Sequence, residues 1–227
     1  MLKKLSSLLF GGSCFLCRGE ARSLLCDACD ADLPRLPAPR CPRCALASPG
    51  GAVCGRCLAH APHYDATAAA LSYDFPADAL IHAFKFRGEL ALASLFSGLL
   101  LQEVASDPAV NFVVPVPLSA RRLRERGYNQ AVELARPLAR AARAPLELGL
   151  CERTRDAPPQ TELPWAERGR NVRGAFRCTR LLAGAAVAVV DDVMTTGATL
   201  EEIAATLKAA GAARVTNWVV ARTSPPA

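Results

Sequence analysis

From residue 66 onward, short apolar runs of strand length alternate with longer stretches whose apolar residues recur at helical spacing. Strands that alternate with helices predict an α/β fold in which helices flank a mostly parallel sheet. The run Ala186–Val190 is continuously apolar, which is typical of a central strand covered on both faces. The expected elements, in order, are a strand over Ala66–Tyr73, helices over Ala77–Phe84 and Leu90–Val104, a strand over Phe112–Val116, a helix over Tyr128–Ala142, a short run over Leu146–Leu150, the strand Ala186–Val190, a helix over Ala198–Ala210 and a strand over Val215–Ala221.

The beginning of the chain lacks this periodicity. No apolar repeat longer than one helical turn occurs before Tyr64, and residues 33–51 are rich in proline and glycine. A segment of this kind cannot bury a core of its own, so bound metal must supply its folding free energy. We therefore expect two domains, a small cysteine-rich one over residues 1–62 and an α/β domain over residues 63–227.

Cysteine spacing indicates which metal is bound. Eight of the ten cysteines form four C-x-x-C pairs, and two such knuckles supply the four thiolates of one tetrahedral Zn²⁺ site. The pairs are Cys14/Cys17, Cys26/Cys29, Cys41/Cys44 and Cys54/Cys57. Two structural zinc sites follow, because a complete Cys₄ set leaves no open coordination position and needs neither His60 nor His63.

The lengths between the pairs bear on which knuckles share an ion. Eight residues separate the first two pairs, nine the last two and eleven the middle two. This favours sequential pairing and two stacked zinc ribbons, with a crossed arrangement as the alternative. A redox role is less favoured, since a redox-active C-x-x-C normally occurs once, at a helix start beside a βαβ unit.

Composition supports a globular chain. The 227 residues are 51% hydrophobic and 21% charged, which fits one ordinary domain with a smaller second one. No stretch reaches the roughly 18 uncharged apolar residues of a membrane span, and the N-terminal apolar run of about three residues is too short for a secretory signal. We expect a cytoplasmic protein with no membrane contact, and hence reduced thiols.

Positive charge is concentrated in residues 119–177, which hold thirteen arginines, no lysine and seven acidic residues. The planar guanidinium group suits phosphate recognition, so this segment predicts a phosphorylated ligand. Four of the arginines cluster just before Gly127, namely Arg121, Arg122, Arg124 and Arg126. Two interpretations of the cluster stay open, a solvated helix face and a contact with phosphate or nucleic acid.

The segment Ala186–Gly211 joins the buried strand to a helix through a polar turn, the place where α/β folds bind ligands. Small and hydroxyl-bearing residues at the start of that helix leave backbone N–H groups free to hold a phosphate. These residues are Thr195, Thr196, Gly197, Ala198 and Thr199. The preceding Asp191 and Asp192 can accept hydrogen bonds from sugar hydroxyls or hold Mg²⁺ through water. A P-loop is excluded, because no lysine of the chain precedes Ser or Thr.

The sequence VVDDVMTTGAT resembles the phosphoribosyl pyrophosphate (PRPP) motif of the type I phosphoribosyltransferases. The resemblance extends over nearly the whole chain to the ComF-like (competence protein F) family, in which a cysteine-knuckle region precedes a phosphoribosyltransferase domain. Three further pieces match, LIHAFKFRGE (Leu80–Glu89), VVPVPLSARRLRERGYNQ (Val113–Gln130) and RTRDAPPQTELPWAERGRNVRGAF (Arg153–Phe176). The resemblance implies a type I phosphoribosyltransferase-like fold behind an N-terminal double zinc ribbon.

The same resemblance implies roles for individual residues. Asp191 and Asp192 would bind the ribose hydroxyls of PRPP, and residues 195–199 would surround its 5′-phosphate. Lys85 and Arg87 of the FKFRG segment would neutralise the leaving pyrophosphate together with Mg²⁺, the alternative being that they solvate a helix end. A loop over residues 153–173 would cover PRPP and exclude water. Its matching polar positions are Arg155, Gln160, Arg168 and Asn171, while Ala157 stands where the family often has threonine.

The resemblance implies two alternative functions. The first is transfer or recognition of a ribosyl 5-phosphate with Mg²⁺, with PRPP or a phosphorylated nucleotide as ligand; if catalysis is retained, the chain is a pentosyl transferase. The second is a non-catalytic cytoplasmic factor that handles single-stranded DNA in competence, with a competence helicase as partner. Aromatic residues make up only 6% of the chain, few for base stacking on DNA.

Overall fold

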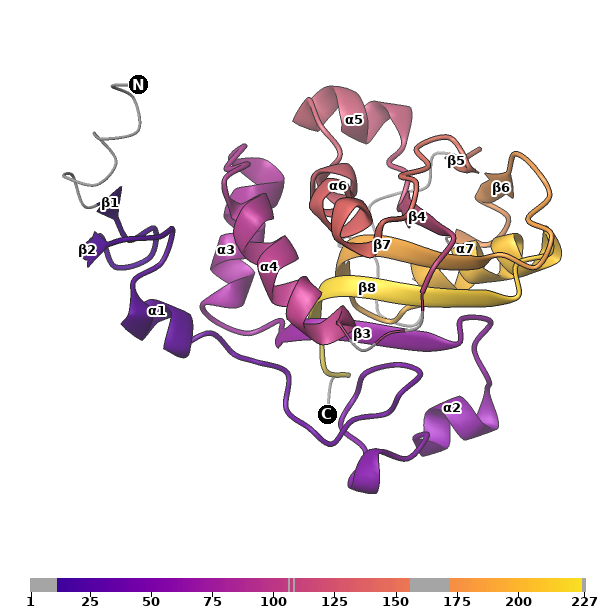
Figure 1. The fold of residues 1–227 in the computed structure, drawn as a ribbon, viewed down its shortest axis with the longest axis horizontal. Helices are drawn as coiled ribbons and strands as arrows, with labels where there is room; N and C mark the ends of the chain where they lie inside the picture. Colours follow the sequence, from indigo (N-terminus) through magenta and orange to yellow (C-terminus); the bar gives the residue numbers. More distant parts are fainter. Residues whose placement is uncertain (1–11, 106, 108, 156–171, 226–227) are drawn as a thin grey trace.

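A four-stranded parallel sheet forms the centre of the molecule (Figure 1) in the computed structural model, which describes residues 12–105, 107, 109–155 and 172–225. The strand order is β3-β8-β7-β4, and every neighbouring pair is parallel. The strands are β3 (Ala66–Ser72), β4 (Phe112–Pro115), β7 (Ala186–Met194) and β8 (Arg214–Arg222). The expected α/β fold with a parallel sheet is confirmed.

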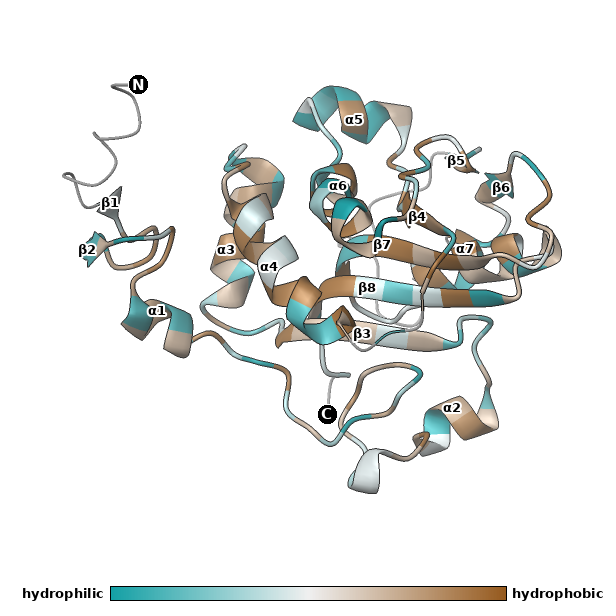
Figure 2. Ribbon diagram, in the orientation of Figure 1, coloured by the Kyte–Doolittle hydropathy of each residue, from teal (hydrophilic) through white to brown (hydrophobic). Residues whose placement is uncertain are grey.

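Helices cover both faces of this sheet. They are α3 (Ala77–Phe86), α4 (Leu92–Val104), α6 (Gln130–Ala142) and α7 (Ala198–Ala209). Alternate residues of β7 point to opposite faces, so Ala188 and Val190 lie in one hydrophobic core and Val187 and Val189 in the other. The first core is packed by α3, α4 and α6, and the second by α7. Figure 2 shows β7 as hydrophobic along most of its length, as a strand buried on both faces requires. Among the described residues, no helix is both long and apolar enough to cross a membrane.

Strand β7 continues beyond its predicted end at Val190. Its pairing with β8 reaches Met194, which lies opposite Arg222. Asp191 and Asp192 therefore belong to the strand and not to the turn after it. The polar side chains do not end the strand, because the ladder is made by backbone N–H and C=O groups, which every residue here supplies.

The arginine cluster lies on a short helix, α5 (Ala120–Arg126). The Ser119 hydroxyl oxygen caps its start by accepting a hydrogen bond from the Arg122 N–H at 3.3 Å. Gly127 ends it with a left-handed φ of 77°, a conformation that costs glycine little. Figure 2 shows this helix as mostly hydrophilic.

The segment between α6 and β7 differs from the sequence expectation. The run Leu146–Leu150 contributes a single bridge, from Leu146 to Val113, in place of a strand. After it, β5 (Cys151–Arg153) and β6 (Phe176–Cys178) pair antiparallel. The chain between them includes residues 156–171, which lie outside the described residues together with the loop positions Gln160, Arg168 and Asn171.

The cysteine-rich region consists of short elements, and an extended linker, residues 32–40, joins its two ribbons. The elements are β1 (Gly12–Ser13), β2 (Glu20–Ala21), α1 (Asp27–Ala31), the 3₁₀ turn η3 (Pro49–Gly51) and α2 (Gly55–Ala59). The linker runs antiparallel beside β3, where the Leu36 N–H donates to the Ala70 carbonyl at 3.0 Å and the Ser72 N–H donates to the Pro34 carbonyl at 2.7 Å. It thereby covers an edge of the sheet whose backbone groups would otherwise be exposed.

The two ribbons do not stack on one another as expected. Figure 1 places β1, β2 and α1 at one end of the linker and α2 at the other. They are kept apart because the linker is held extended along β3. Leu25 and Leu33 of the first ribbon lie in the core of α3 and α4, whereas Ala45 of the second is buried with Ala69 and Val219 in the core of α7. Each ribbon is thus stabilised by the α/β domain, and the division at residue 62 remains a prediction.

Candidate functional site

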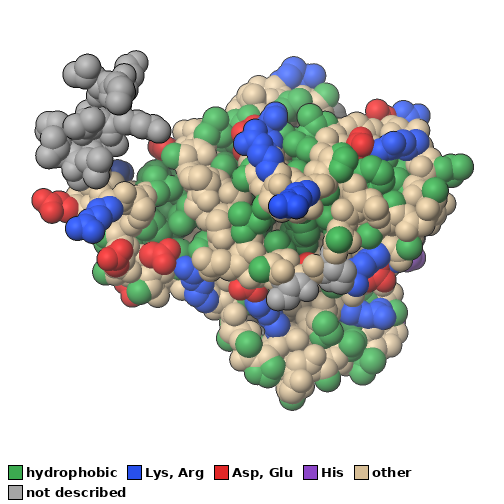
Figure 3. All heavy atoms as spheres, viewed as in Figure 1, with side chains coloured by type: hydrophobic (Ala, Val, Ile, Leu, Met, Phe, Trp, Pro, Cys, Tyr) green, Lys and Arg blue, Asp and Glu red, His purple; other side chains and the backbone are tan. Residues whose placement is uncertain are grey.

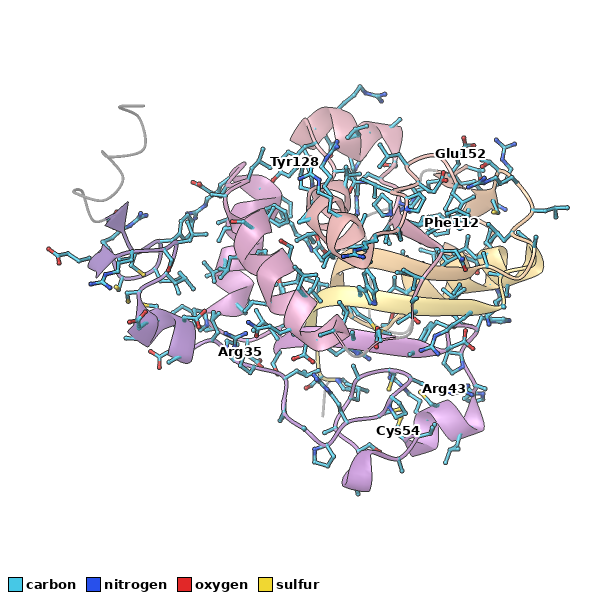
Figure 4. The ribbon with its side chains drawn as sticks, viewed as in Figure 1. Arg35, Arg43, Cys54, Phe112, Tyr128 and Glu152 are labelled. Carbon is cyan, nitrogen blue, oxygen red and sulfur yellow. The ribbon has the colours of Figure 1, made fainter. Side chains whose placement is uncertain are left out.

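The eight paired cysteines gather in two separate clusters, whose sulfur atoms are visible in Figure 4. Within each cluster the four sulfur atoms all lie within 4.8 Å of one another. The members are Cys14, Cys17, Cys26 and Cys29 in the first cluster and Cys41, Cys44, Cys54 and Cys57 in the second. Sequential pairing is therefore confirmed, and the crossed arrangement is wrong.

The two clusters repeat one local geometry. In each, the residue after a knuckle has a left-handed φ, 66° at Arg18 and 59° at Ala45. The N–H of that residue donates to the carbonyl of the first cysteine, Cys14 at 3.0 Å and Cys41 at 2.9 Å. This tight turn directs the two thiols of the first knuckle toward one point, and the second knuckle, at the start of α1 or α2, adds two more convergent thiols. This donor set fits a structural Zn²⁺ ion with tetrahedral coordination.

At the first cysteine of each cluster, backbone hydrogen bonds favour the thiolate form that binds Zn²⁺, whereas burial and neighbouring thiols raise the pKa of Cys29, Cys44 and Cys57. The N–H groups of Cys17 and Cys26 lower the pKa of Cys14 to about 6. At Cys41 burial raises the pKa, but backbone hydrogen bonds, including one from the Cys54 N–H at 3.3 Å, outweigh it and bring the pKa to about 7. Among the described residues, His60 and His63 join neither cluster.

Asp192 is held from two sides at the carboxyl end of β7. The residue is only 5% exposed. Its Oδ1 atom lies 2.8 Å from Nζ of Lys85 on α3, and its Oδ2 atom accepts a hydrogen bond from Nε2 of Gln130 on α6 at 3.1 Å. The fold thus brings two of the predicted site residues, Lys85 and Asp192, into an ion pair. Gln130 was not among the predicted site residues, although it closes the GYNQ sequence.

Asp191 has a different environment from its neighbour. Burial, together with the charge of Asp192, raises the pKa of Asp191 to about 7, although the nearby Lys85 cation opposes the shift. Arg126 of α5 also acts on these carboxylates: burial lowers the pKa of Arg126, and the charges of Asp192 and Asp191 raise it. Its guanidinium lies over the ring of Phe86, 4.9 Å from the centroid.

The other basic residues of the prediction lie further from the acids. Arg87 is the exposed C-cap residue of α3, and none of the ion pairs found among the described residues joins it to Asp191 or Asp192. Arg121 is exposed and pairs with Glu125 on its own helix at 3.3 Å. The arginine cluster is therefore divided, with Arg126 directed inward and Arg121 solvated.

The turn after β7 is shaped by one glycine. Gly197 is the N-cap of α7 and has φ 86°, a left-handed conformation. A Cβ atom at this position would lie 2.7 Å from Cε of Met194 and 3.4 Å from the Tyr64 hydroxyl oxygen, so only glycine fits without displacement. The Thr196 hydroxyl oxygen accepts from the Ala198 N–H at 3.2 Å. The turn delivers the amino end of a twelve-residue helix, where the dipole and free N–H groups favour an anion.

Arg222 connects this turn to the second cysteine cluster. It is the last residue of β8 and is 1% exposed. Its Nε atom donates to the Cys44 carbonyl at 2.9 Å, and its Nη1 atom donates to the carbonyls of Met194, at 2.9 Å, and Thr195. The predicted strand ended at Ala221 and did not include this residue; its signal in the sequence is a cation directly after the apolar run of β8.

A cavity of about 460 Å³ opens between α2 and the amino end of α7. Arg56 and His60 line it from the second ribbon, and Gly197 and Glu201 line it from the turn and α7. Glu201 is held by His63, whose Nδ1 atom lies 2.5 Å from Oε1. One wall of this cavity therefore comes from the cysteine-rich region.

These observations define a class of protein. A parallel sheet carries paired acids at the end of a central strand, a threonine-rich turn leads from that strand into a helix, and two Cys₄ clusters precede the sheet. This is a phosphoribosyltransferase-type domain with an N-terminal double zinc ribbon. Protein-family models agree: the double zinc ribbon domain matches residues 5–58, and the phosphoribosyl transferase domain matches residues 128–224.

The chain belongs to the ComF family. It is 36% identical over 222 residues to the DNA utilization protein YhgH of Escherichia coli K12, covering 93% of this chain and 97% of the relative. It is 30% identical over 226 residues to Competence protein F of Haemophilus influenzae, covering 94% and 98%. Among solved structures, the glutamine PRPP amidotransferase of B. subtilis is similar, with a TM-score of 0.39 and 26% identity over 56% of this chain and 25% of that one.

Proposed function

We propose that the protein binds PRPP, or another ribosyl 5-phosphate, together with Mg²⁺ at the carboxyl end of β7. One observation carries the proposal: Asp191 and Asp192 lie in the same strand–turn–helix unit as residues 195–199, only a few residues apart. Carboxylates suit the hydroxyls of a ribose, and the N–H groups at the amino end of α7 suit its 5-phosphate. The unit therefore offers both halves of a ribosyl phosphate a chemically matched partner.

The surrounding residues match the charge of pyrophosphate. Mg²⁺, when bound, would neutralise part of this charge, and Asp191 and Asp192 would hold the ion directly or through water. Lys85 and Arg126 add fixed positive charge beside these carboxylates. Because this positive charge is already in position before the reaction, it would stabilise the negative charge that develops on the departing pyrophosphate. Arg87, exposed at the end of α3, is proposed as a further contact with pyrophosphate.

Calorimetric titration of the zinc-loaded protein with PRPP, with and without Mg²⁺, tests this proposal. We expect Mg²⁺-dependent binding in the wild type and its loss in the double variant Asp191→Asn, Asp192→Asn. The matched control is Asp27→Asn, an exposed acid on α1 of the first ribbon. A folded wild type that does not bind PRPP would contradict the proposal. Release of pyrophosphate on adding nucleobases distinguishes transfer from recognition alone.

A second candidate function is the handling of single-stranded DNA. Two observations favour it, the exposed arginines of α5 and the DNA utilization and competence names of the relatives. Figure 3 shows the Lys and Arg side chains of one face in small separate groups and not in a continuous stripe, which favours a few phosphate contacts over a long groove. We propose a competence helicase as the protein partner in this function.

The salt dependence of binding to a labelled single-stranded oligonucleotide tests this second function. If phosphate contacts dominate, the logarithm of the affinity falls linearly with the logarithm of salt concentration. We expect the double variant Arg121→Ala, Arg124→Ala to lose about one or two phosphate contacts. Each lost contact should reduce the slope by about 0.7. The control pair Arg22→Ala, Arg140→Ala removes two exposed arginines elsewhere and should leave the slope unchanged. A flat salt response in the wild type would exclude this function.

A further inference from the structure

The side chain of Arg222 is the structural link between the second cysteine cluster and the turn that begins α7. On one side, Nε donates to the carbonyl of Cys44, a member of the second cluster whose sulfur lies 3.6 Å from that of Cys54. On the other side, Nη1 donates to the carbonyls of Met194 and Thr195, which begin the turn. One rigid guanidinium group therefore bonds to a metal-cluster residue and to the predicted phosphate turn at once.

These bonds also orient the turn's N–H groups. A trans peptide is planar, and its C=O and N–H bonds point in opposite directions. Because the Met194 and Thr195 carbonyls point toward Arg222, the N–H groups of Thr195 and Thr196 point away from it. The Met194 carbonyl also accepts from the Thr223 N–H at 3.1 Å, whereas the guanidinium of Arg222 bonds both carbonyls and so helps to hold outward the donors that an anion at this turn would use.

Moving either the Cys44 carbonyl or the carbonyls of the turn away from Arg222 would cost free energy. Arg222 is 1% exposed, so a carbonyl that moves away leaves a buried charge with fewer partners. Its Nη2 atom already has no hydrogen-bond partner within the described part of the chain, and its other hydrogen bonds all go to carbonyls, including that of Thr223 at 2.8 Å. The turn also packs against the second ribbon's side of the core, where Ala45, Tyr64 and Met194 are buried together.

The first cluster has no comparable connection. Its residues Cys14 and Leu25 belong to the other core, which packs against α3 and α4. None of the hydrogen bonds found among the described residues joins residues 12–32 to residues 194–199. The chain therefore contains an internal control, with one cluster bonded to the turn and one that is not.

We propose that Arg222 is a positioning residue that makes the geometry of the 194–199 turn depend on the second cysteine cluster being metal-loaded, and not on the first. The inference rests on the proposed function only in taking this turn as the phosphate site. Loss of metal from the second cluster would release the Cys44 backbone, and the turn would lose the bonds that orient its N–H groups.

Hydrogen exchange of the full chain, followed by mass spectrometry, tests the coupling without any ligand. Cys57→Ser weakens the second cluster and Cys29→Ser the first. We expect exchange in residues 194–199 to accelerate about tenfold or more with Cys57→Ser and to change by less than about twofold with Cys29→Ser, as loss of one or two charged hydrogen bonds predicts. Equal effects of the two variants, or no effect of Cys57→Ser, would overturn the proposal.

Arg222→Met separates the bridge from the metal. We expect this variant to keep two zinc ions per chain by colorimetric assay and still accelerate exchange at the turn as Cys57→Ser does. Arg222→Lys retains the charge and can reach one carbonyl, so its exchange should be intermediate; it replaces Arg222→Met if that variant does not fold. If Arg222→Lys and Arg222→Met both retain zinc and show unchanged hydrogen exchange in residues 194–199, the positioning role is refuted.

Titration with inorganic phosphate and with PRPP connects the turn to binding. We expect Cys57→Ser and Arg222→Met to weaken binding about tenfold and Cys29→Ser to leave it within about twofold, in line with the loss of oriented N–H donors. If the wild type binds neither anion, the proposed function fails while the exchange experiment still decides the coupling. If binding falls equally in both cysteine variants, the coupling fails while the phosphate site stands.

Discussion

At the scale of residues, the two acids at the end of β7 are neighbours in sequence but not equivalent in the fold. Asp192 is paired with Lys85 and accepts a hydrogen bond from Gln130, so its charge is compensated. Asp191 is the less compensated of the two, and burial together with the charge of Asp192 raises its pKa to about 7. The Asp192 N–H, 2.9 Å away, stabilises its carboxylate only in part. Of the two acids, Asp191 is therefore the one whose protonation changes near neutral pH.

This difference predicts a pH dependence for Mg²⁺-assisted binding. Because the pKa of Asp191 is raised to about 7, the carboxylate that can hold Mg²⁺ predominates only above that pH. The charges facing it are Asp192 from its own strand, Lys85 from α3 and Arg126 from α5. We expect calorimetric affinity for PRPP with Mg²⁺ to fall by up to about tenfold per pH unit below about pH 7, as competition with one proton requires. If the affinity of the Asp191→Asn variant changes with pH in the same way, the pH dependence comes from another group.

Gly197 gives a prediction about the turn itself. Gly197→Ala places a Cβ at φ 86° and 2.7 Å from Cε of Met194. We expect a loss of about 1–2 kcal/mol in the free energy of unfolding, measured by urea denaturation, together with weaker PRPP binding. Gly98→Ala is the matched control, because Gly98 lies inside α4 with nothing within 4 Å of a new Cβ. The control should be neutral or stabilising by up to about 1 kcal/mol, and equal losses would show that strain at Gly197 is not the cause.

At the scale of elements, the linker between the ribbons acts as an edge strand of the sheet. Its residues 34–36 bond to β3, and further on the Arg40 side chain donates to the Ala69 carbonyl at 2.8 Å. Sheet edges expose N–H and C=O groups that can pair with other chains. The linker covers this edge without being a regular strand, because it contains three prolines, which cannot donate to a ladder.

The bond between Leu36 and Ala70 can be tested by comparing two variants. Leu36→Pro removes the N–H that donates to the Ala70 carbonyl at 3.0 Å, whereas Leu36→Ala removes most of the side chain and keeps that N–H. We expect the proline variant to be about 1 kcal/mol less stable to urea than the alanine variant, the usual contribution of one backbone hydrogen bond. Equal stabilities would mean that the linker's backbone does not contribute to the sheet.

At the scale of the whole molecule, the cysteine-rich region is part of the α/β core. The sheet face that carries α7 is completed by Ala45, and Arg222 is bonded to Cys44. The first ribbon inserts Leu25 and Leu33 into the opposite core. Both faces of the sheet therefore depend on residues whose positions are set by the two Cys₄ clusters.

Metal removal should consequently lower the stability of the entire chain. We expect a zinc chelator to reduce the melting temperature by about 10 °C or more, because metal binding to such clusters is coupled to folding. Near-ultraviolet circular dichroism in a Trp165→Phe background reports on Trp218, which is 2% exposed in the sheet. The control is the same chelator saturated with zinc beforehand. A Trp218 signal that melts at an unchanged temperature would show that the ribbons fold independently of the sheet.

Local patterns in the sequence were sufficient for much of this architecture. The cysteine spacing predicted two sequential Cys₄ clusters, and alternating periodicity predicted the sheet strands and the helices α3, α4, α6 and α7 with small errors at their ends. The position of α2 across a cavity from the amino end of α7 and the antiparallel course of the linker were not predicted. The two ribbons were expected to stack, because nothing in their sequence indicates that the linker bonds to β3.

The sequence alone therefore determined the features whose parts lie close together in the chain. The first metal cluster is contained within sixteen residues and the second within seventeen. The acids and the turn after them form one continuous segment. Short-range spacing and backbone geometry therefore define these features. Tertiary structure decided which distant groups meet. The Gln130–Asp192 bond spans 62 positions and the Arg222–Cys44 bond spans 178, and both depend on how two sheet faces are packed. Residue spacing does not encode such contacts, because they arise only when buried surfaces and buried charges are satisfied together.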